Sequence, residues 1–175
     1  MGKPYQKLSA CGRYVFREIL PHELEEMFAL ILSRMRWMDE VGIKQWNVTY
    51  YDEVYPLSYY EECRKKGEIY VLSDIERGDI LCVAALKNED ERWENDGVPA
   101  YYLHHFASRT DRKGIGSIYL QLAEQFATEQ GKVYFRLDSA VGNMPLERYY
   151  SSRGYKAAGK CVDGLYKGIL RQKKL

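Results

Sequence analysis

The sequence predicts one α/β domain, in the mixed α+β sense, with helices packed on a mixed sheet. Two observations support this. Short β-rich runs are joined by hairpin-type turns in the first hundred residues, and a strand–helix–strand pattern follows them. The length of 175 residues allows one well-buried core but not two comfortable domains. We expect residues 11–175 to form this domain and residues 1–10 to be a flexible tail.

The first half begins with a β-rich run at 14–20, followed by Pro21 and an apolar stripe of helical period from Leu24 to Met38. The stripe predicts a helix ending near Gly42, and a second helix is expected over 57–66. Residues 43–56 have no clean period and are predicted to be a loop. Strands are predicted over 68–73, 80–86 and 100–107, with a hairpin turn between the first two.

In the second half, an apolar stripe from Ile115 to Phe126 predicts a helix that stops near Gly131. A strand over 132–138 and a short helix over 145–153 follow. Two last strands, over 155–161 and 165–171, flank Asp163-Gly164, which is a strong hairpin turn.

Composition excludes several classes of partner. The net charge is +1, so electrostatics does not favour nucleic acid or an anionic membrane. No apolar run approaches the roughly 18 residues of a membrane span, and a secretory signal is not recognisable. The four scattered cysteines lack zinc-ligand spacing, so we expect reduced thiols, no metal cofactor and a cytoplasmic location.

The most informative segment lies between the strand ending at Ala107 and the helix beginning at Ile115. Gly114 and Gly116 permit unusual backbone angles and close approach of a ligand. The first amides of the following helix have no internal partner, so they form an anion site suited to a pyrophosphate. Arg112 and Lys113 add positive charge there. On the glycines alone, a plain strand–helix turn is an equally good interpretation.

Two other nucleotide motifs were weighed. A phosphate-binding P-loop needs Gly-Lys-Ser/Thr after its glycines, and the chain has no such run. A dinucleotide (Rossmann) fingerprint fits Gly114 and Gly116, but Tyr119 occupies its third glycine position. Asp138 stands where a ribose-binding acid would, yet too few residues follow it for the remaining βαβ units.

The run Asp111-Arg112-Lys113-Gly114-Ile115-Gly116 resembles the acetyl-CoA loop of GNAT N-acetyltransferases, written Gln/Arg-x-x-Gly-x-Gly/Ala. The run from Asn143 to Tyr155 resembles the later Asn…Tyr-x-x-x-Gly-Phe/Tyr element of that family. Both segments occur in the right order, about 30 residues apart. The resemblance covers nearly the whole chain and implies a central, mostly antiparallel sheet with helices on both faces. Asp111 departs from the motif.

The resemblance also implies roles for individual residues. Backbone groups of Phe106, Ala107 and Ser108 would bind the pantetheine arm of acetyl-CoA, and Asn143 would contact the cofactor. Tyr150 would protonate the departing thiolate. The pyrophosphate would bind at the loop residues Arg112, Lys113, Gly114, Ile115, Gly116 and Ser117.

The general base is less determined by the sequence. His104 and His105 lie on the strand before the loop, and strand alternation predicts that they point to opposite faces. Either could be a base or part of a water relay, but a structural histidine is the favoured interpretation of each. Trp37, Trp46 and Tyr51 are expected to line the substrate entrance.

These features predict acetyl transfer from acetyl-CoA to a primary amine of a small molecule or peptide, by direct attack without an acyl-enzyme. The substitution at Asp111 keeps a second hypothesis open, a non-catalytic acyl-CoA-binding module. A Rossmann-type oxidoreductase is a third alternative. The sequence leaves a homodimer open and does not identify the acceptor amine.

Overall fold

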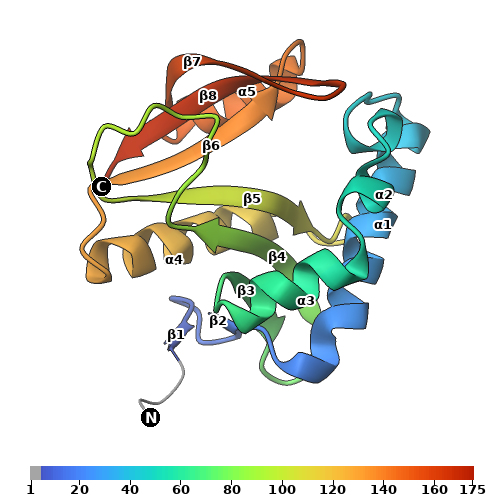
Figure 1. Ribbon diagram of the computed structural model, residues 1–175. Coiled ribbons are helices and arrows are strands. Elements are labelled where there is room, and N and C mark those ends of the chain that lie inside the picture. Colours follow the sequence, from blue (N-terminus) through green and yellow to red (C-terminus); the bar gives the residue numbers. More distant parts are fainter. Residues whose placement is uncertain (1–4) are drawn as a thin grey trace.

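The structure, a computed structural model, describes residues 5–175 and contains one eight-stranded sheet of order β1-β2-β3-β4-β5-β6-β8-β7. Figure 1 shows the sheet twisting through the molecule, with β7 and β8 far from β1. The strands are β1 Gln6–Leu8, β2 Tyr14–Glu18, β3 Ile69–Asp74, β4 Ile80–Lys87, β5 Ala100–Ser108, β6 Tyr134–Ala140, β7 Lys156–Asp163 and β8 Tyr166–Lys174. The helices are α1 Leu24–Val41, α2 Tyr51–Val54, α3 Leu57–Lys65, α4 Ile115–Glu129 and α5 Met144–Ser152.

The sheet is mixed and mostly antiparallel, as the resemblance implied. β5 and β6 run parallel, and every other strand pair in residues 5–175 is antiparallel. A dinucleotide-binding fold is built on a mostly parallel sheet. The Rossmann-type alternative is therefore wrong.

The expected tail over residues 1–10 contains a strand. β1 pairs antiparallel with β2, matching Gln6 with Arg17 and Leu8 with Val15. β1 is only three residues long, so its alternation of apolar and polar residues is too short to be recognised in the sequence. The first four residues lie outside the described part of the chain.

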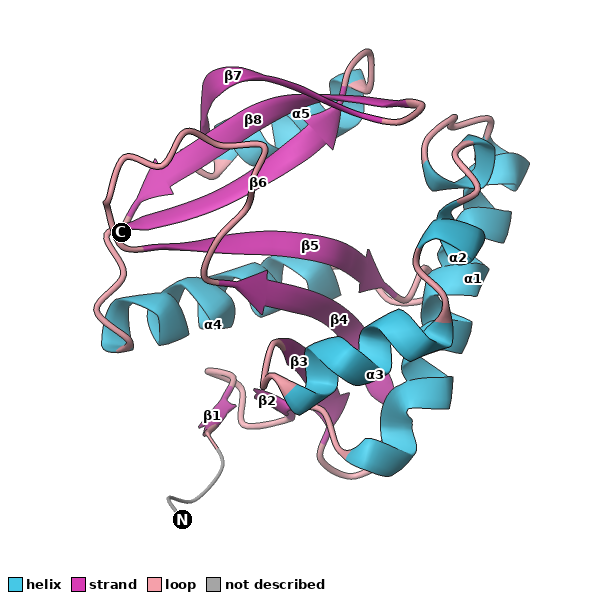
Figure 2. Cartoon of the chain, in the orientation of Figure 1, coloured by secondary structure: helices cyan, strands magenta, loops and turns pink. Residues whose placement is uncertain are grey.

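Helices cover both faces of the sheet, as Figure 2 shows. One apolar cluster joins α4 to the sheet and includes the buried side chains of Phe16, Tyr119, Phe126 and Phe135. A second cluster packs α1 and α3 against the other face. The long helix α1 ends where predicted, because Gly42 adopts a left-handed conformation (φ 73°) whose amide contacts the carbonyls of the last turn.

The predicted loop over 43–56 is partly helical. It contains a 3-10 helix, Trp46–Val48, and the short helix α2. Trp46 and Tyr51 are buried and stack with ring centroids 4.5 Å apart. Because aromatic packing orders these single turns, no helical period is visible in the sequence.

Two irregularities of β5 position the functional site. β5 pairs with β6 only from Ala100 to Tyr102, after which the two strands diverge toward α2 (Figure 1). Against β4, the register shifts between Val83 and Ala85, which is a β-bulge at His105. The second half of β5 therefore has β4 on one side and no strand partner on the other.

Candidate active site

The divergence of β5 and β6 opens into a cavity of about 640 Å³, within the range of about 300–1,000 Å³ typical of small-molecule sites. α1 and α2 border it on one side, and α5 and the β7–β8 hairpin border it on the other. Most predicted site residues line it: Trp37, Trp46, Tyr51, His104, His105, Phe106, Ser108, Arg112, Gly114, Ile115, Gly116, Ser117, Asn143 and Tyr150. Ala107 is buried in the core, and Lys113 is exposed outside the lining.

The glycine loop has the geometry of an anion site. Gly114 precedes α4 with φ 82°, a left-handed conformation that glycine adopts without strain. A Cβ at Gly116 would lie 3.4 Å from the Tyr149 hydroxyl and 3.5 Å from Phe106 Cζ. A side chain larger than alanine at Gly116 would therefore compete with Tyr149 and Phe106 for space. The α4 amides that follow point into this space with the positive end of the helix dipole.

The structure shows how the charge of Asp111 is neutralised. Arg109 binds both of its carboxylate oxygens, at 2.9 and 2.6 Å, and also contacts Asp79 at 2.8 Å. Arg112 lines the cavity, but its Nη1 lies 3.2 Å from Oδ2 of Asp74. The negative charge of Asp111 is therefore balanced by Arg109. The positive charge of Arg112 is partly balanced by the buried carboxylate of Asp74.

Helix α5 brings Asn143 and two tyrosines to the cavity. Asn143 is the helix N-cap, since its Oδ1 accepts a hydrogen bond of 3.2 Å from the Leu146 amide. Tyr150 is 4% exposed, and burial raises the pKa of its hydroxyl well above the usual value. Tyr150 therefore keeps its proton at neutral pH. Its neighbour Tyr149 also lines the cavity, beside Gly116.

The prediction that His104 and His105 point to opposite faces is wrong. His105 has φ 56° at the β-bulge, which interrupts the strand alternation. Both imidazoles line the same cavity, with ring centroids 5.9 Å apart. A positive φ in a non-glycine residue is strained and is most often found at functional sites.

His105 is held by two tyrosine hydroxyls. Its Nδ1 makes a hydrogen bond with Tyr51, and its Nε2 lies 2.9 Å from the Tyr59 hydroxyl. Burial, together with the nearby positive charges, holds the pKa of His105 well below its usual value. His105 is therefore neutral at physiological pH and donates from only one of its nitrogens.

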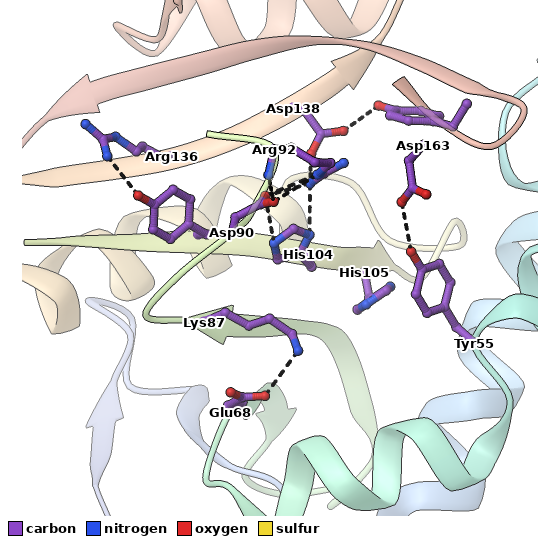
Figure 3. Close-up of polar contacts among 12 residues, drawn as sticks. Tyr55, Glu68, Lys87, Asp90, Arg92, His104, His105, Arg136, Asp138 and Asp163 are labelled. Atoms are coloured by element: carbon purple, nitrogen blue, oxygen red, sulfur yellow. Dashed lines mark hydrogen bonds and ion pairs between the residues drawn. The ribbon is translucent and has the colours of Figure 1, made fainter. Parts of the chain in front are cut away.

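His104 belongs to a charged network that Figure 3 shows. Its Nε2 lies 3.2 Å from Asp90 Oδ2, and its Nδ1 lies 3.3 Å from Arg92 Nη2. Arg92 contacts Asp90 and Asp138 at 2.8 Å each. The Tyr166 hydroxyl donates a hydrogen bond of 2.6 Å to Asp138. The network joins the loop before β5 to β6 and β8, beside the cavity.

Several cavity-lining residues were missed by sequence reasoning: Arg34, Arg92, Asp138 (considered only as a ribose-binding acid), Tyr149, Asp163 and Tyr166. Most come from loops or strand ends whose spatial proximity depends on the β5–β6 divergence. Arg34 is the exception, because a charged residue within the apolar stripe of α1 is visible in the sequence.

Residues 5–175 contain no group of three or more His, Cys, Asp or Glu side chains arranged to bind a metal ion. None of their helices is both long and apolar enough to span a membrane.

Comparison with known proteins agrees with this geometry. The sequence model described as "Acetyltransferase (GNAT) family" matches residues 29–155. No curated protein shows a significant match to the chain.

Solved structures share the fold. An acetyltransferase of the GNAT family from Listeria monocytogenes is 22% identical, with a TM-score of 0.76, and the match covers 98% of this chain and 100% of that one. One from Streptococcus agalactiae is 19% identical with a TM-score of 0.75, covering 99% of each chain. The PaiA N-acetyltransferase from Thermoplasma acidophilum, solved in complex with coenzyme A, is 17% identical with a TM-score of 0.70, covering 93% of this chain and 99% of that one.

Proposed function

Because this chain belongs to the acetyltransferase (GNAT) family, we propose that it transfers an acetyl group from acetyl-CoA to a primary amine of a small molecule or peptide. The observation that carries the proposal is the unpaired second half of β5, which leads directly to the amides of α4. Together they offer one continuous surface, with backbone hydrogen-bonding groups for an extended amide chain and an anion site for a pyrophosphate.

In this proposal, backbone groups of Phe106, Ala107 and Ser108 bind the pantetheine arm in the place of a neighbouring strand. Burial of the Ala107 side chain on the opposite face does not affect its backbone. The pyrophosphate binds at residues 112–117, where Arg112 is the cavity-lining cation and Lys113 contributes charge from outside. Asn143 keeps its amide nitrogen for the cofactor, because its capping bond uses only Oδ1.

The chemistry is direct attack. The amine nitrogen bonds to the thioester carbonyl carbon, the carbon–sulfur bond breaks, and Tyr150 donates its proton to the departing thiolate. Its high pKa supports this role, since the hydroxyl must be protonated when the bond breaks. Trp37, Trp46 and Tyr51 form the acceptor side of the cavity.

For proton removal we propose His104, acting through water, rather than His105. Asp90 lies beside His104 and would stabilise its imidazolium form, as a carboxylate does in other acid–base sites. Nδ1 of His104 can accept the proton once its contact with Arg92 is broken. Arg92 can give up this contact because it keeps Asp90 and Asp138 as partners. His105 is disfavoured because burial opposes its protonation.

A non-catalytic acyl-CoA-binding module is the second candidate. One observation favours it: both ring nitrogens of each histidine already contact protein groups. Binding and turnover separate the two candidates. Calorimetric titration with acetyl-CoA tests the site itself, and release of free thiol with a panel of primary amines tests transfer. Binding without thiol release from any amine would favour the module, and no binding would overturn both.

A further inference from the structure

Arg34 lies on the buried face of α1. Ile31 and Met38, three residues before and four after it, are buried, and residues at this spacing share one face of a helix. Arg34 accordingly is half-buried and lines the cavity. Arg36, two residues on, is exposed. A charged side chain thus occupies a position that the helix otherwise gives to its core.

Arg34 has no ion pair or hydrogen bond to any side chain in residues 5–175, whereas the cavity-lining Arg92 and Arg112 contact carboxylates. Its guanidinium carbon lies 4.2 Å from the ring centroid of Trp37, so the ring face is its main electrostatic partner. Burial lowers the pKa of Arg34, because the half-buried side chain loses part of its contact with water. A desolvated cation without an anion costs stability.

The groups around Arg34 do not supply a negative charge. Cys82 and Tyr150 act on it electrostatically, and burial raises the pKa of both, so both are neutral at physiological pH. The carboxylates that line the cavity have other partners, since Asp138 contacts Arg92 and Tyr166, and Asp163 accepts a hydrogen bond from Tyr55. The unsatisfied cation therefore lies near the proposed reaction centre at Tyr150.

We propose that Arg34 binds a carboxylate carried by one of the two substrates, close to the reacting atoms. The inference rests on the proposed function, since it names the substrate class of the same site. A guanidinium donates two parallel hydrogen bonds to a carboxylate, and a water-poor cavity strengthens them. The carboxylate belongs either to the acceptor, as in an amino acid, or to the acyl chain, as in succinyl-CoA. The Trp37 ring holds the guanidinium in place for it.

The experiment has one arm for each source. In the acceptor arm, amino acids are compared with their α-carboxamides by calorimetric binding and by thiol release with acetyl-CoA. In the acyl arm, succinyl-CoA is compared with acetyl-CoA in the same two assays. The parent protein is expected to prefer the carboxylate by about tenfold to a hundredfold in one arm, as one charged hydrogen-bonded pair provides. No preference in either arm overturns the proposal.

Three variants test whether the carboxylate preference depends on Arg34. R34Q is expected to abolish it while CoA affinity changes less than twofold, and R36Q, the exposed neighbour, is expected to retain it. R34M should raise the melting temperature while losing the preference, because the desolvated charge is removed. A preference that survives R34Q contradicts the proposal, as does an R36Q effect of the same size. A loss of CoA affinity in R34Q would show that Arg34 binds the cofactor instead.

Failure of this inference is distinguishable from failure of the proposed function. If the parent protein does not bind acetyl-CoA, the proposed function is overturned, while the binding of amino acids and their carboxamides still tests Arg34. If acetyl-CoA binds and thiol is released without any carboxylate preference, only the inference about Arg34 is overturned.

Discussion

Tyr150 and Tyr149 are adjacent on α5, yet their surroundings differ. The Tyr150 ring is buried beside Tyr155, whereas the Tyr149 hydroxyl lies against the Gly116 backbone and its ring lies 3.6 Å from the Arg153 guanidinium carbon. In the proposed function, the two hydroxyls therefore face different parts of the site, the reaction centre and the pyrophosphate loop.

Tyr150→Phe is expected to lower kcat by about 10²–10⁴-fold with little change in acetyl-CoA affinity, because only the proton donor is lost. Tyr149→Phe is the matched control and should act on acetyl-CoA affinity, leaving kcat nearly unchanged. Steady-state kinetics with calorimetry measures both. Reversed effects would mean that the two tyrosines exchange these roles.

Substitutions of His104 and His105 are expected to have different effects. His104→Gln should lower kcat/KM by about 10²-fold, since it takes away the proposed proton acceptor. His105→Gln should mainly lower the melting temperature, because it breaks buried contacts with Tyr51 and Tyr59. A kcat/KM unchanged in His104→Gln would exclude this base.

At the scale of an element, the β5–α4 connection combines a glycine with a left-handed backbone, Gly114, and a closely packed glycine, Gly116. Gly116→Val should weaken acetyl-CoA binding by about tenfold or more, because overpacking typically costs about 1–3 kcal/mol. Gly114→Ala places a Cβ with no atom within 4 Å but at φ 82°, so it should lower stability by about 1 kcal/mol and leave affinity closer to normal. Titration and thermal unfolding of the pair distinguish these effects, and equal affinities in the two variants would contradict the loop assignment.

The loop before β5 is stabilised by the ion-pair network. Burial alone would raise the pKa of Asp90, but hydrogen bonds from His104 and Arg92 outweigh burial and hold that pKa well below its usual range. A depressed folded-state pKa stabilises the fold above the unfolded value of about 3.9, and this contribution is lost as pH falls below that value toward the folded pKa.

Asp90→Asn should therefore lower the free energy of unfolding by about 1–3 kcal/mol at neutral pH and flatten its decline below about pH 4. Urea unfolding between pH 3 and pH 7 measures both. Glu89→Gln, a change at the neighbouring exposed position, is the control and should have no comparable effect. If the free energy of unfolding of Asp90→Asn falls as steeply below pH 4 as that of the parent protein, the role of Asp90 is contradicted.

Elements with a clear local period were predictable. The apolar stripes of α1 and α4 and the turns between β3 and β4 and between β7 and β8 all gave the right element near its observed bounds. β1, α2 and the bulge at His105 were not predictable, because each depends on contacts with distant residues. For the site, the motifs located the loop and α5, whereas the His104 network depends on strand pairing that no local pattern encodes.

At the scale of the whole molecule, the sheet consists of two parts joined by three residue pairs of β5 and β6. A ligand lying in the divergence would connect them. At a concentration 100 times its Kd, acetyl-CoA should stabilise the fold by about 2.7 kcal/mol and raise the melting temperature by about 5–10 °C. NAD is the control and should have no such effect.

Hydrogen exchange tests where that stabilisation arises. Amides of residues 103–108 and 115–117 should exchange more slowly in the presence of acetyl-CoA, because they face the proposed site. Protection confined to β1 and β2, none of whose residues line the cavity, would contradict binding in the divergence of the strands.

The interior position of the unpaired half of β5 also bears on how the protein behaves during purification and storage. Natural proteins protect the edges of their sheets because exposed backbone groups recruit strands from other chains. Here the unpaired edge lies at the centre of the sheet, flanked by α1 and α5. The cavity walls restrict which polypeptide segments can reach it. Bound acetyl-CoA would therefore cover these backbone groups, and ligand-free preparations should aggregate sooner than preparations kept with acetyl-CoA.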